Sequence, residues 1–218
     1  MTQEELKDRR PLASRNTRWA QAIARFLARR SVTPNHISQA SMVAAALAGL
    51  AFWWAGHGEG VERTVMLLFA ALFCQLRLLC NLFDGMVAVE GGKGAADGPF
   101  WNEFPDRVAD VFILAGAGAG IELPELGWAA AALAILTAYT RELGRSNGLP
   151  ADFSGPMAKQ HRMATITAAA LLTVLEPLWS GQDEILTIAL MIIVVGCVIT
   201  VVRRSWHIIT QLKARASK

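Results

Sequence analysis

Charge is scarce in this sequence. Acidic and basic residues make up 18% of the 218 residues, against roughly a quarter in an ordinary soluble domain. Hydrophobic residues make up 53%, and the mean hydropathy is positive, at +0.34. So little charge argues against a soluble globular protein and predicts a chain embedded in lipid.

Cysteine pairs and a secretory leader are also missing. The three cysteines, Cys74, Cys80 and Cys197, lie inside apolar runs without CxxC spacing, which excludes a disulfide framework or zinc site and leaves packing as their role. Residues 1–16 are polar and lack the apolar core and cleavage site of a secretory signal, so we expect nothing to be removed. The net charge is +3, but the basic residues lie beside apolar runs, which indicates membrane topology and no nucleic-acid partner.

What the sequence has instead is long apolar runs. Each is about 18 to 25 residues long, enough for a helix to cross roughly 30 Å of hydrocarbon. The sequence therefore predicts an all-α fold, an integral membrane bundle of about six transmembrane helices. The expected spans are 36–55, 64–88, 102–121, 126–143, 163–179 and 184–202. We expect residues 1–35 to form a cytoplasmic N-terminal segment and residues 36–218 the six-helix domain that carries the chemistry, with a basic cytoplasmic tail.

An amphipathic stretch precedes the first span. Between residues 16 and 30 apolar side chains recur at helical spacing with arginines off that stripe, which predicts a juxtamembrane helix lying on an anionic leaflet. The apolar members are Trp19, Ile23, Phe26 and Leu27, and the basic ones are Arg18, Arg25 and Arg29.

Loop charges orient the predicted bundle. The N-terminal segment, the loop 141–162 and the tail 203–218 are basic, whereas the turns on the opposite side are acidic, with Arg63 as their single cation. By the positive-inside rule the basic side and both termini are cytoplasmic, in the inner membrane if the protein is bacterial. The small residues at 116–120 predict close approach of neighbouring helices, and His161 and His207 are expected to be solvated at the cytoplasmic face.

Polar side chains inside the second and third spans gather at one membrane depth. They lie at three- and four-residue spacing, Arg77, Asn81 and Asp84 on one span and Glu103, Asp106 and Asp110 on the next. Charged groups in a spanning helix cost a few kcal/mol each and usually face a polar cavity. Because a short loop joins the two spans, we expect them to be neighbours whose carboxylates face one cavity. Close carboxylates repel unless a cation bridges them, and Mg²⁺ or Mn²⁺ suits oxygen ligands together with substrate phosphates.

This pattern resembles the signature of the CDP-alcohol phosphotransferases. The unit Asp84-Gly85-x-x-Ala88 followed by Asp106-x-x-x-Asp110 is similar to the family's D-x-x-D-G-x-x-A-R, a spacer, then G-x-x-x-D-x-x-x-D. Two further segments resemble the family: Thr33-Pro34-Asn35 before the first span, and Arg141 with the GPMAK segment 155–159 and Arg162 before the fifth. The resemblance implies a six-helix membrane enzyme.

The match to the signature is incomplete. Asn81, Val89 and Asn102 stand where the family has Asp, Arg and Gly. The spacer is also longer, and it contains Glu90, Lys93 and Asp97. On sequence proximity alone, we suggest Lys93 as the replacement for the missing positive charge and Glu103 for the missing carboxylate. The departures predict a divergent subgroup, with a catalytically inactive relative as the alternative.

The resemblance implies a metal-dependent transfer of a substituted phosphate, phosphatidyl in phospholipid synthesis, from a CDP-alcohol such as CDP-diacylglycerol to an acceptor hydroxyl. CMP is released, and one or two Mg²⁺ or Mn²⁺ ions are the implied cofactor. The acceptor is a phosphorylated polyol such as glycerol 3-phosphate or inositol phosphate, although a neutral alcohol such as serine stays open.

The resemblance also assigns roles to particular residues. The implied metal ligands are Asp84, Asp106, Asp110 and Asn81, with Asp106 and Asp110 catalytic and Asp110 either a ligand or the base. The implied nucleotide-binding residues are Asn81, Asp84, Gly85 and Ala88. The implied acceptor-phosphate residues are Arg77, Arg141, Lys159 and Arg162. We expect Asp106→Asn to abolish CMP release and leave the fold intact.

Each assignment has a plainer alternative. The carboxylates can end helices in interfacial water, Arg77 can pair with Asp84 alone, and the basic loop can reflect topology. At the level of the whole chain, the alternatives are a prenyltransferase-like enzyme and a transporter or inactive scaffold. Displacement of substrate by CMP, and not by isoprenyl diphosphates, would exclude the first, whereas a lack of nucleotide binding would favour the second. Homodimerisation is left open.

Overall fold

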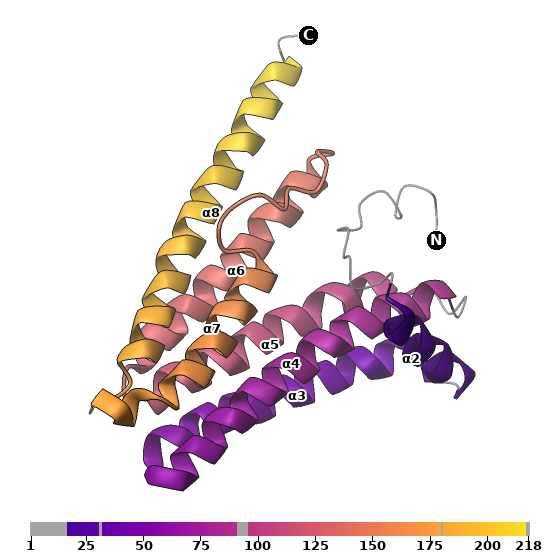
Figure 1. Cartoon of the computed structure of the whole chain (residues 1–218). Coiled ribbons are helices and arrows are strands. Elements are labelled where there is room, and N and C mark those ends of the chain that lie inside the picture. Colours follow the sequence, from indigo (N-terminus) through magenta and orange to yellow (C-terminus); the bar gives the residue numbers. More distant parts are fainter. Residues whose placement is uncertain (1–16, 31, 91–95, 180, 217–218) are drawn as a thin grey trace.

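The structure is a computed structural model that describes residues 17–30, 32–90, 96–179 and 181–216. Its elements are α2 (Arg18–Arg29), α3 (Pro34–His57), α4 (Gly60–Glu90), α5 (Gly98–Gly120), α6 (Pro124–Ser146), α7 (Lys159–Thr173), the 3-10 helix η2 (Glu176–Trp179) and α8 (Glu184–Ala216). No strand occurs in these described ranges. The all-α prediction is therefore confirmed for this part of the chain (Figure 1).

Each predicted span corresponds to a helix, although the ends differ. Three segments have the length and apolar composition of a membrane crossing: Pro34–His57, Gly60–Val89 and Glu184–Ala216. The largest difference is in the last span, predicted to end at 202, because α8 continues through the expected basic tail to Ala216. In the predicted span 163–179, α7 begins earlier, at Lys159, and ends at Thr173. The α-helix cannot continue through Pro177, because proline lacks an N–H and disfavours helical geometry in the residue before it. The chain turns there through η2.

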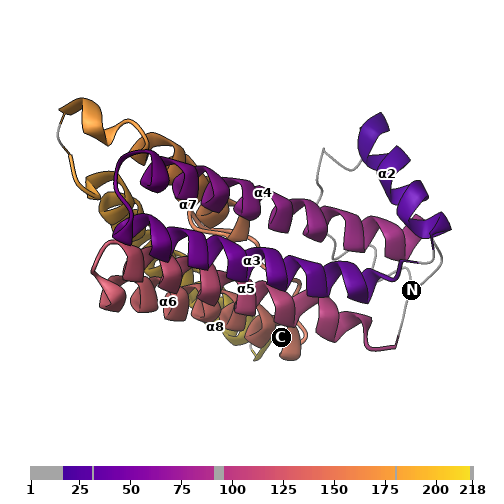
Figure 2. The ribbon, with the colours of Figure 1, turned by 90° about the horizontal axis from the view of Figure 1, so that it is seen from below.

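The helices pack in a closed ring, in the order α3, α4, α7, α8, α6 and α5, with α5 returning to α3. The apolar core fills this ring with alanines and branched side chains. The order differs from the predicted side-by-side packing of the second and third spans, because α3 lies between α4 and α5, which touch each other only sparsely (Figure 2). Their polar ends nevertheless face one another.

Close packing of α5 on α3 depends on glycine. A Cβ atom placed on Gly116 would lie 2.4 Å from the carbonyl oxygen of Gly49, and one on Gly120 would lie 2.3 Å from that of Phe52. No side chain fits at those distances, so the two backbones can approach only because both positions lack a Cβ. The predicted close approach at 116–120 is confirmed.

The short helix α2 crosses one end of the bundle and packs on α4 (Figure 2). Its inner face presents the fully buried Ala20 and Ala24 to a cluster that includes Phe83 and Val87 of α4. These α4 residues flank Asp84, so α2 supports the helix segment that carries the motif. The outer face leaves Trp19, Ile23 and Phe26 exposed.

At the opposite end of the bundle, ion pairs of Arg63 connect α4 to the turn before α8. Arg63, in the first turn of α4, lies 3.3 Å from Glu176 and 2.8 Å from Asp183. The buried Glu176 carboxylate also accepts hydrogen bonds from the backbone N–H groups of Asp183 and Ile185, at 2.9 and 2.8 Å. These contacts satisfy the buried charge and fix the turn that leads into α8.

Candidate active site

Asp106 lies inside a charged cluster that joins α4, α5 and α7. Its Oδ1 is 3.1 Å from Nη2 of Arg77 on α4, and its Oδ2 is 2.5 Å from Nζ of Lys159 at the start of α7. Arg77 is fully buried and also donates to the carbonyl oxygen of Asp106, at 3.4 Å. The predicted pairing of Arg77 with a carboxylate is therefore present, with Asp106 rather than Asp84 as the partner.

Asp110, one turn further along α5, pairs with Arg162 of α7. Its Oδ2 lies 2.6 Å from Nη2 of Arg162, and both side chains are 3% exposed. Arg162 donates in addition to the carbonyl oxygen of Met157 at 2.9 Å and to the hydroxyl of Thr137 at 3.2 Å. The second oxygen of Asp110, Oδ1, is buried and has no hydrogen-bond partner among the described residues. That oxygen is the free acceptor of the cluster.

Asp84 is held differently from the other two carboxylates. Its Oδ2 accepts a hydrogen bond from the Ser38 hydroxyl of α3 at 3.0 Å, and its Oδ1 accepts from the backbone N–H of Gly85. Within the described ranges no lysine or arginine forms an ion pair with it, although Lys159 and Asp106 are close enough to act on its charge. Asp84 and Asp106 thus converge near the amine of Lys159.

One face of α8 holds the loop that leads into α7. Positions 200, 204 and 207 are three or four residues apart and therefore lie on the same side of the helix. The Thr200 hydroxyl accepts from the N–H of Met157, Nε of Arg204 donates to the carbonyl oxygen of Ser154, and Nδ1 of His207 contacts Oδ2 of Asp152, each at 3.0 Å. This loop leads directly into α7 at Lys159. By holding the loop, the α8 face therefore positions the basic residues of α7 in the site.

His207 is thus tied to the loop, in addition to being partly solvated as expected. Burial opposes ionisation of Asp152, but hydrogen bonds from Ser154 and from His207 outweigh it and keep the pKa of Asp152 below its usual value. Gly155 of the same loop has a φ of +114°, and a Cβ there would lie 2.6 Å from Cγ2 of Thr200. Glycine is required at this position for both reasons.

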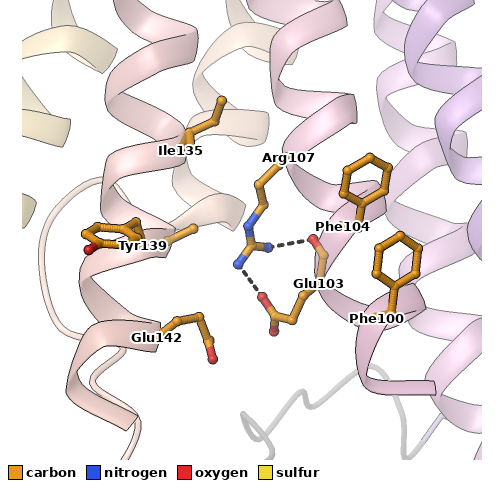
Figure 3. A pocket seen from close by; sticks show the side chains of 8 residues that line it. Phe100, Glu103, Phe104, Arg107, Ile135, Tyr139 and Glu142 are labelled. Carbon is orange, nitrogen blue, oxygen red and sulfur yellow. Dashed lines mark hydrogen bonds and ion pairs between the residues drawn. The ribbon is translucent and has the colours of Figure 1, made fainter. Parts of the chain in front are cut away.

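A shallow pocket between α5 and α6 is lined by Glu103 and by Arg107, whose Nη1 lies 3.8 Å from Oδ2 of Asp106. Figure 3 shows the Glu103 carboxylate bound by Arg107, with Phe104 and Tyr139 on either side. Glu103 also pairs with Arg141, which contacts Glu142 at 2.9 Å and lies over the ring of Phe153. The contacts of Glu103 and Arg141 are therefore with this second cluster, and the structure does not bring them onto the three motif carboxylates.

The longer spacer is attached to the start of α3. Nδ2 of Asn35 lies 3.2 and 3.1 Å from the two carboxylate oxygens of Asp97, and Nε1 of Trp101 donates to Asp97 at 2.9 Å. These hydrogen bonds, that of Asn35 first, lower the pKa of Asp97. Asn35 of the Thr-Pro-Asn segment thus connects the start of α3 to Asp97, just before α5. Lys93 and the side chain of Glu90 lie outside the described residues.

Most of the predicted site residues lie together at one end of the bundle. The cluster contains Arg77, Asp84, Asp106, Asp110, Lys159 and Arg162. On α4 beside them are the half-buried Asn81, Gly85 and Ala88. The amide nitrogen of Asn81 is buried and lacks a hydrogen-bond partner among the described residues. Arg141 is the predicted member whose contacts are elsewhere.

The oxygen atoms of this cluster fit a hard divalent cation. Within the described ranges no group of three or more His, Cys, Asp or Glu side chains forms a complete metal cage. Mg²⁺, however, is commonly held by one or two carboxylates together with substrate phosphates and water. Asp84, which has no ion pair in the described part, and the unpartnered Oδ1 of Asp110 supply such ligands. The donor set suits an ion bound together with a phosphate substrate.

Sequence reasoning missed the residues that hold this cluster in place. They are Ser38, Thr137, Thr200 and Arg204. Arg204 is 4% exposed and donates to the carbonyl oxygen of Thr137 at 2.6 Å. Its position one turn after Thr200 is a usable signal, but Arg204 lies within the predicted basic tail 203–218, where topology alone explains an arginine.

The all-helical bundle, with carboxylates of α4 and α5 facing basic residues of α7, agrees with the membrane enzyme that the resemblance to the CDP-alcohol phosphotransferases implies. No protein-family model matches the chain. The chain is 28% identical over 196 residues to the phosphatidylinositol phosphate synthase of Streptomyces avermitilis, covering 86% of this chain and 77% of that protein. It is 26% identical over 168 residues to the inner membrane protein YnbA of Escherichia coli, covering 74% and 78%.

Solved structures share the fold. The chain is similar to Mycobacterium tuberculosis phosphatidylinositol phosphate synthase (PgsA1) with CDP-DAG bound, with a TM-score of 0.73 and 21% identity over 88% of this chain and 94% of that one. The complex of the same protein with manganese and citrate gives a TM-score of 0.73, 21% identity and coverages of 88% and 89%. The family resemblance predicted from the motif is confirmed, and the predicted enzyme class, divalent metal and membrane location agree with these relatives.

Proposed function

We propose that this protein transfers a phosphatidyl group from CDP-diacylglycerol, or a similar CDP-alcohol, to a hydroxyl of a phosphorylated polyol and releases CMP. The observation that carries the proposal is the buried cluster in which Asp106 of the motif lies between Arg77 and Lys159. Because relatives are named phosphatidylinositol phosphate synthases, inositol phosphate is the first acceptor to test, ahead of glycerol 3-phosphate.

The reaction exchanges one oxygen on phosphorus for another. The acceptor oxygen attacks the phosphorus that carries the lipid, the bond from that phosphorus to the bridging oxygen breaks, and CMP leaves with the electron pair. The hydroxyl proton passes to Oδ1 of Asp110, the oxygen without a described partner. Arg162 holds the other oxygen of Asp110 at 2.6 Å and so fixes the orientation of the carboxylate.

The other residues of the cluster are assigned roles by where they lie around the three carboxylates. Mg²⁺ or Mn²⁺, when bound, neutralises the diphosphate charge, and Asp84 and Asp106 would hold it, with Asn81 as a weaker ligand. Asp110 would be a further ligand only if it is not the base. The small Gly85 and Ala88 leave room for the nucleotide beside α4. Lys159 is about a third exposed, which leaves its amine within reach of an acceptor phosphate. An acceptor role for Arg141 stays a prediction, since its contacts are with Glu103 and Glu142.

The site faces the cytoplasm in this proposal. All six helices from α3 to α8 cross the membrane, and α2 lies on the cytoplasmic leaflet with Trp19, Ile23 and Phe26 toward lipid. The exposure of these three side chains beside Arg18, Arg25 and Arg29 supports that placement. The domain limits at 1–35 and 36–218 stay predictions, as does a homodimer, which the mass of the protein in detergent would test.

The test is CMP release by the purified protein in detergent with Mn²⁺, CDP-diacylglycerol and each acceptor in turn. Asp84→Asn is a cleaner variant than Asp106→Asn, because Asp106→Asn leaves the buried Arg77 without its carboxylate. We expect Asp84→Asn to lower turnover by about 100-fold or more at an unchanged melting temperature, as for loss of one transition-state contact. Glu125→Gln, at the exposed start of α6, is the control. Full turnover by Asp84→Asn, or no CMP release with any acceptor, would overturn the proposal.

A further inference from the structure

The first turns of α3 contact both acidic segments of the candidate site. Asn35 and Ser38 are three residues apart and so lie on one side of the helix. Asn35 binds Asp97 just before α5, and Ser38 binds Asp84 near the end of α4. The start of α3 is itself fixed, because Pro34 begins the helix and the Thr33 hydroxyl accepts a hydrogen bond from the N–H of His36 at 3.3 Å.

Ser38 is buried inside the candidate site, in contact with Asp84. The residue is 3% exposed, and Asp84 is 7% exposed, so water competes little for the 3.0 Å hydrogen bond between them. The Asp106 and Asp110 carboxylates are oriented by arginine and lysine, but Asp84 has only the Ser38 hydroxyl as a side-chain hydrogen-bond donor within the described ranges. A hydroxyl orients a carboxylate without cancelling its charge, which leaves that charge available to a cation.

We propose that Ser38 is a positioning residue of the metal and nucleotide site, whose hydroxyl holds the Asp84 carboxylate in the orientation that receives a divalent ion. The inference rests on the proposed function, because Asp84 is a metal ligand only there. Ser38 does not touch the reacting atoms. The carbonyl oxygen of Pro34, 3.2 Å from the same hydroxyl, is the alternative acceptor on its own helix.

The chain offers a matched control one turn further along the same helix. Ser41 is fully buried, like Ser38, but its hydroxyl has no hydrogen-bond partner among the described residues. Ser41→Ala therefore removes a buried hydroxyl from α3 without touching Asp84. Ser38→Thr keeps a hydroxyl at the site, and Ser38→Cys keeps the volume with a weaker donor.

The experiment is a Mn²⁺ titration of each variant in detergent with CMP present, followed by the electron paramagnetic resonance signal of the free ion. A hydrogen bond to a charged group predicts about tenfold weaker Mn²⁺ binding for Ser38→Ala. We expect a smaller loss for Ser38→Cys, near-normal binding for Ser38→Thr and no change for Ser41→Ala. Should Ser38→Ala not fold, the order of Ser38→Cys and Ser38→Thr carries the same test.

The outcomes separate this inference from the proposed function. Normal Mn²⁺ binding by Ser38→Ala or Ser38→Cys, while the wild-type protein binds Mn²⁺ and releases CMP, overturns the positioning role alone. Equal losses in Ser38→Ala and Ser41→Ala overturn it too, because the effect is then one of helix packing. A wild-type protein that neither binds Mn²⁺ nor releases CMP overturns the proposed function and this inference together.

Discussion

At the scale of single residues, variants of the buried pair Asp110 and Arg162 distinguish effects on stability from effects on catalysis. Arg162→Met should destabilise the protein by about 3 to 5 kcal/mol, because it leaves a buried carboxylate without its partner. The double variant with Asp110→Asn removes both charges and should recover most of that loss, while CMP release stays absent in both. Thermal unfolding in detergent measures the first effect and the CMP assay the second. A single variant that melts like the wild type would show that the pair is not buried as described.

Asn81 gives a second prediction at this scale. Its amide nitrogen is buried without a described partner, at a position where the family signature has an aspartate. Asn81→Asp replaces the proposed neutral ligand by a carboxylate, and we expect tighter Mn²⁺ binding, by about tenfold for a gain of roughly 1.4 kcal/mol. Without metal the variant should be less stable, because a further negative charge then lies close to Asp84. Asn81→Ala is the control, and equal Mn²⁺ affinity of Asn81→Asp and the wild type would exclude this position from the metal site.

At the scale of elements, the loop before α7 predicts a selective effect on the acceptor. Gly155→Ala places a Cβ against Thr200 at a left-handed φ, so the loop must shift together with Lys159. We expect the KM for the acceptor to rise about tenfold while the KM for the CDP-alcohol changes little. Gly148→Ala is the matched control: its φ is also left-handed, at +71°, but its Cβ would meet only Arg215, at 3.6 Å. Equal effects of the two variants on both substrates would contradict a role for the loop in acceptor binding.

Elements also show what the sequence alone could and could not predict. Apolar length located the helices from α3 to α8, and helical spacing located the polar faces of α4 and α5, because both signals depend on local geometry. The order of helices around the ring depends on side-chain packing between distant segments, and nothing in the sequence of residues 90–98 indicates that α3 separates α4 from α5. For the same reason the sequence indicated that Arg77 needs a carboxylate but not that the carboxylate belongs to Asp106.

At the scale of the whole molecule, the charged cluster around Asp106 and the ion pairs of Arg63 lie at opposite ends of the bundle. α4 begins beside Arg63, which is bound to Glu176 and Asp183, and ends beside Asp84 and the basic residues of α7. Exposed apolar side chains such as Leu50, Val195 and Val202 lie along the helices between these ends. A belt of exposed apolar side chains bounded by two charged ends is expected of a membrane-crossing bundle, and the proposed orientation places its more basic end toward the cytoplasm.

This arrangement predicts which exposed residues an impermeant thiol reagent reaches in intact bacterial cells. In a background without the three native cysteines, Glu59→Cys and Glu125→Cys should be labelled from outside, because they lie in acidic turns at the Arg63 end. Asn147→Cys and Lys213→Cys should be labelled only after the cells are made permeable, because they lie at the basic end. The opposite labelling pattern would place the candidate site outside the cell, away from any cytoplasmic supply of CDP-linked substrate, and labelling of all four in intact cells would contradict a bundle that crosses the membrane.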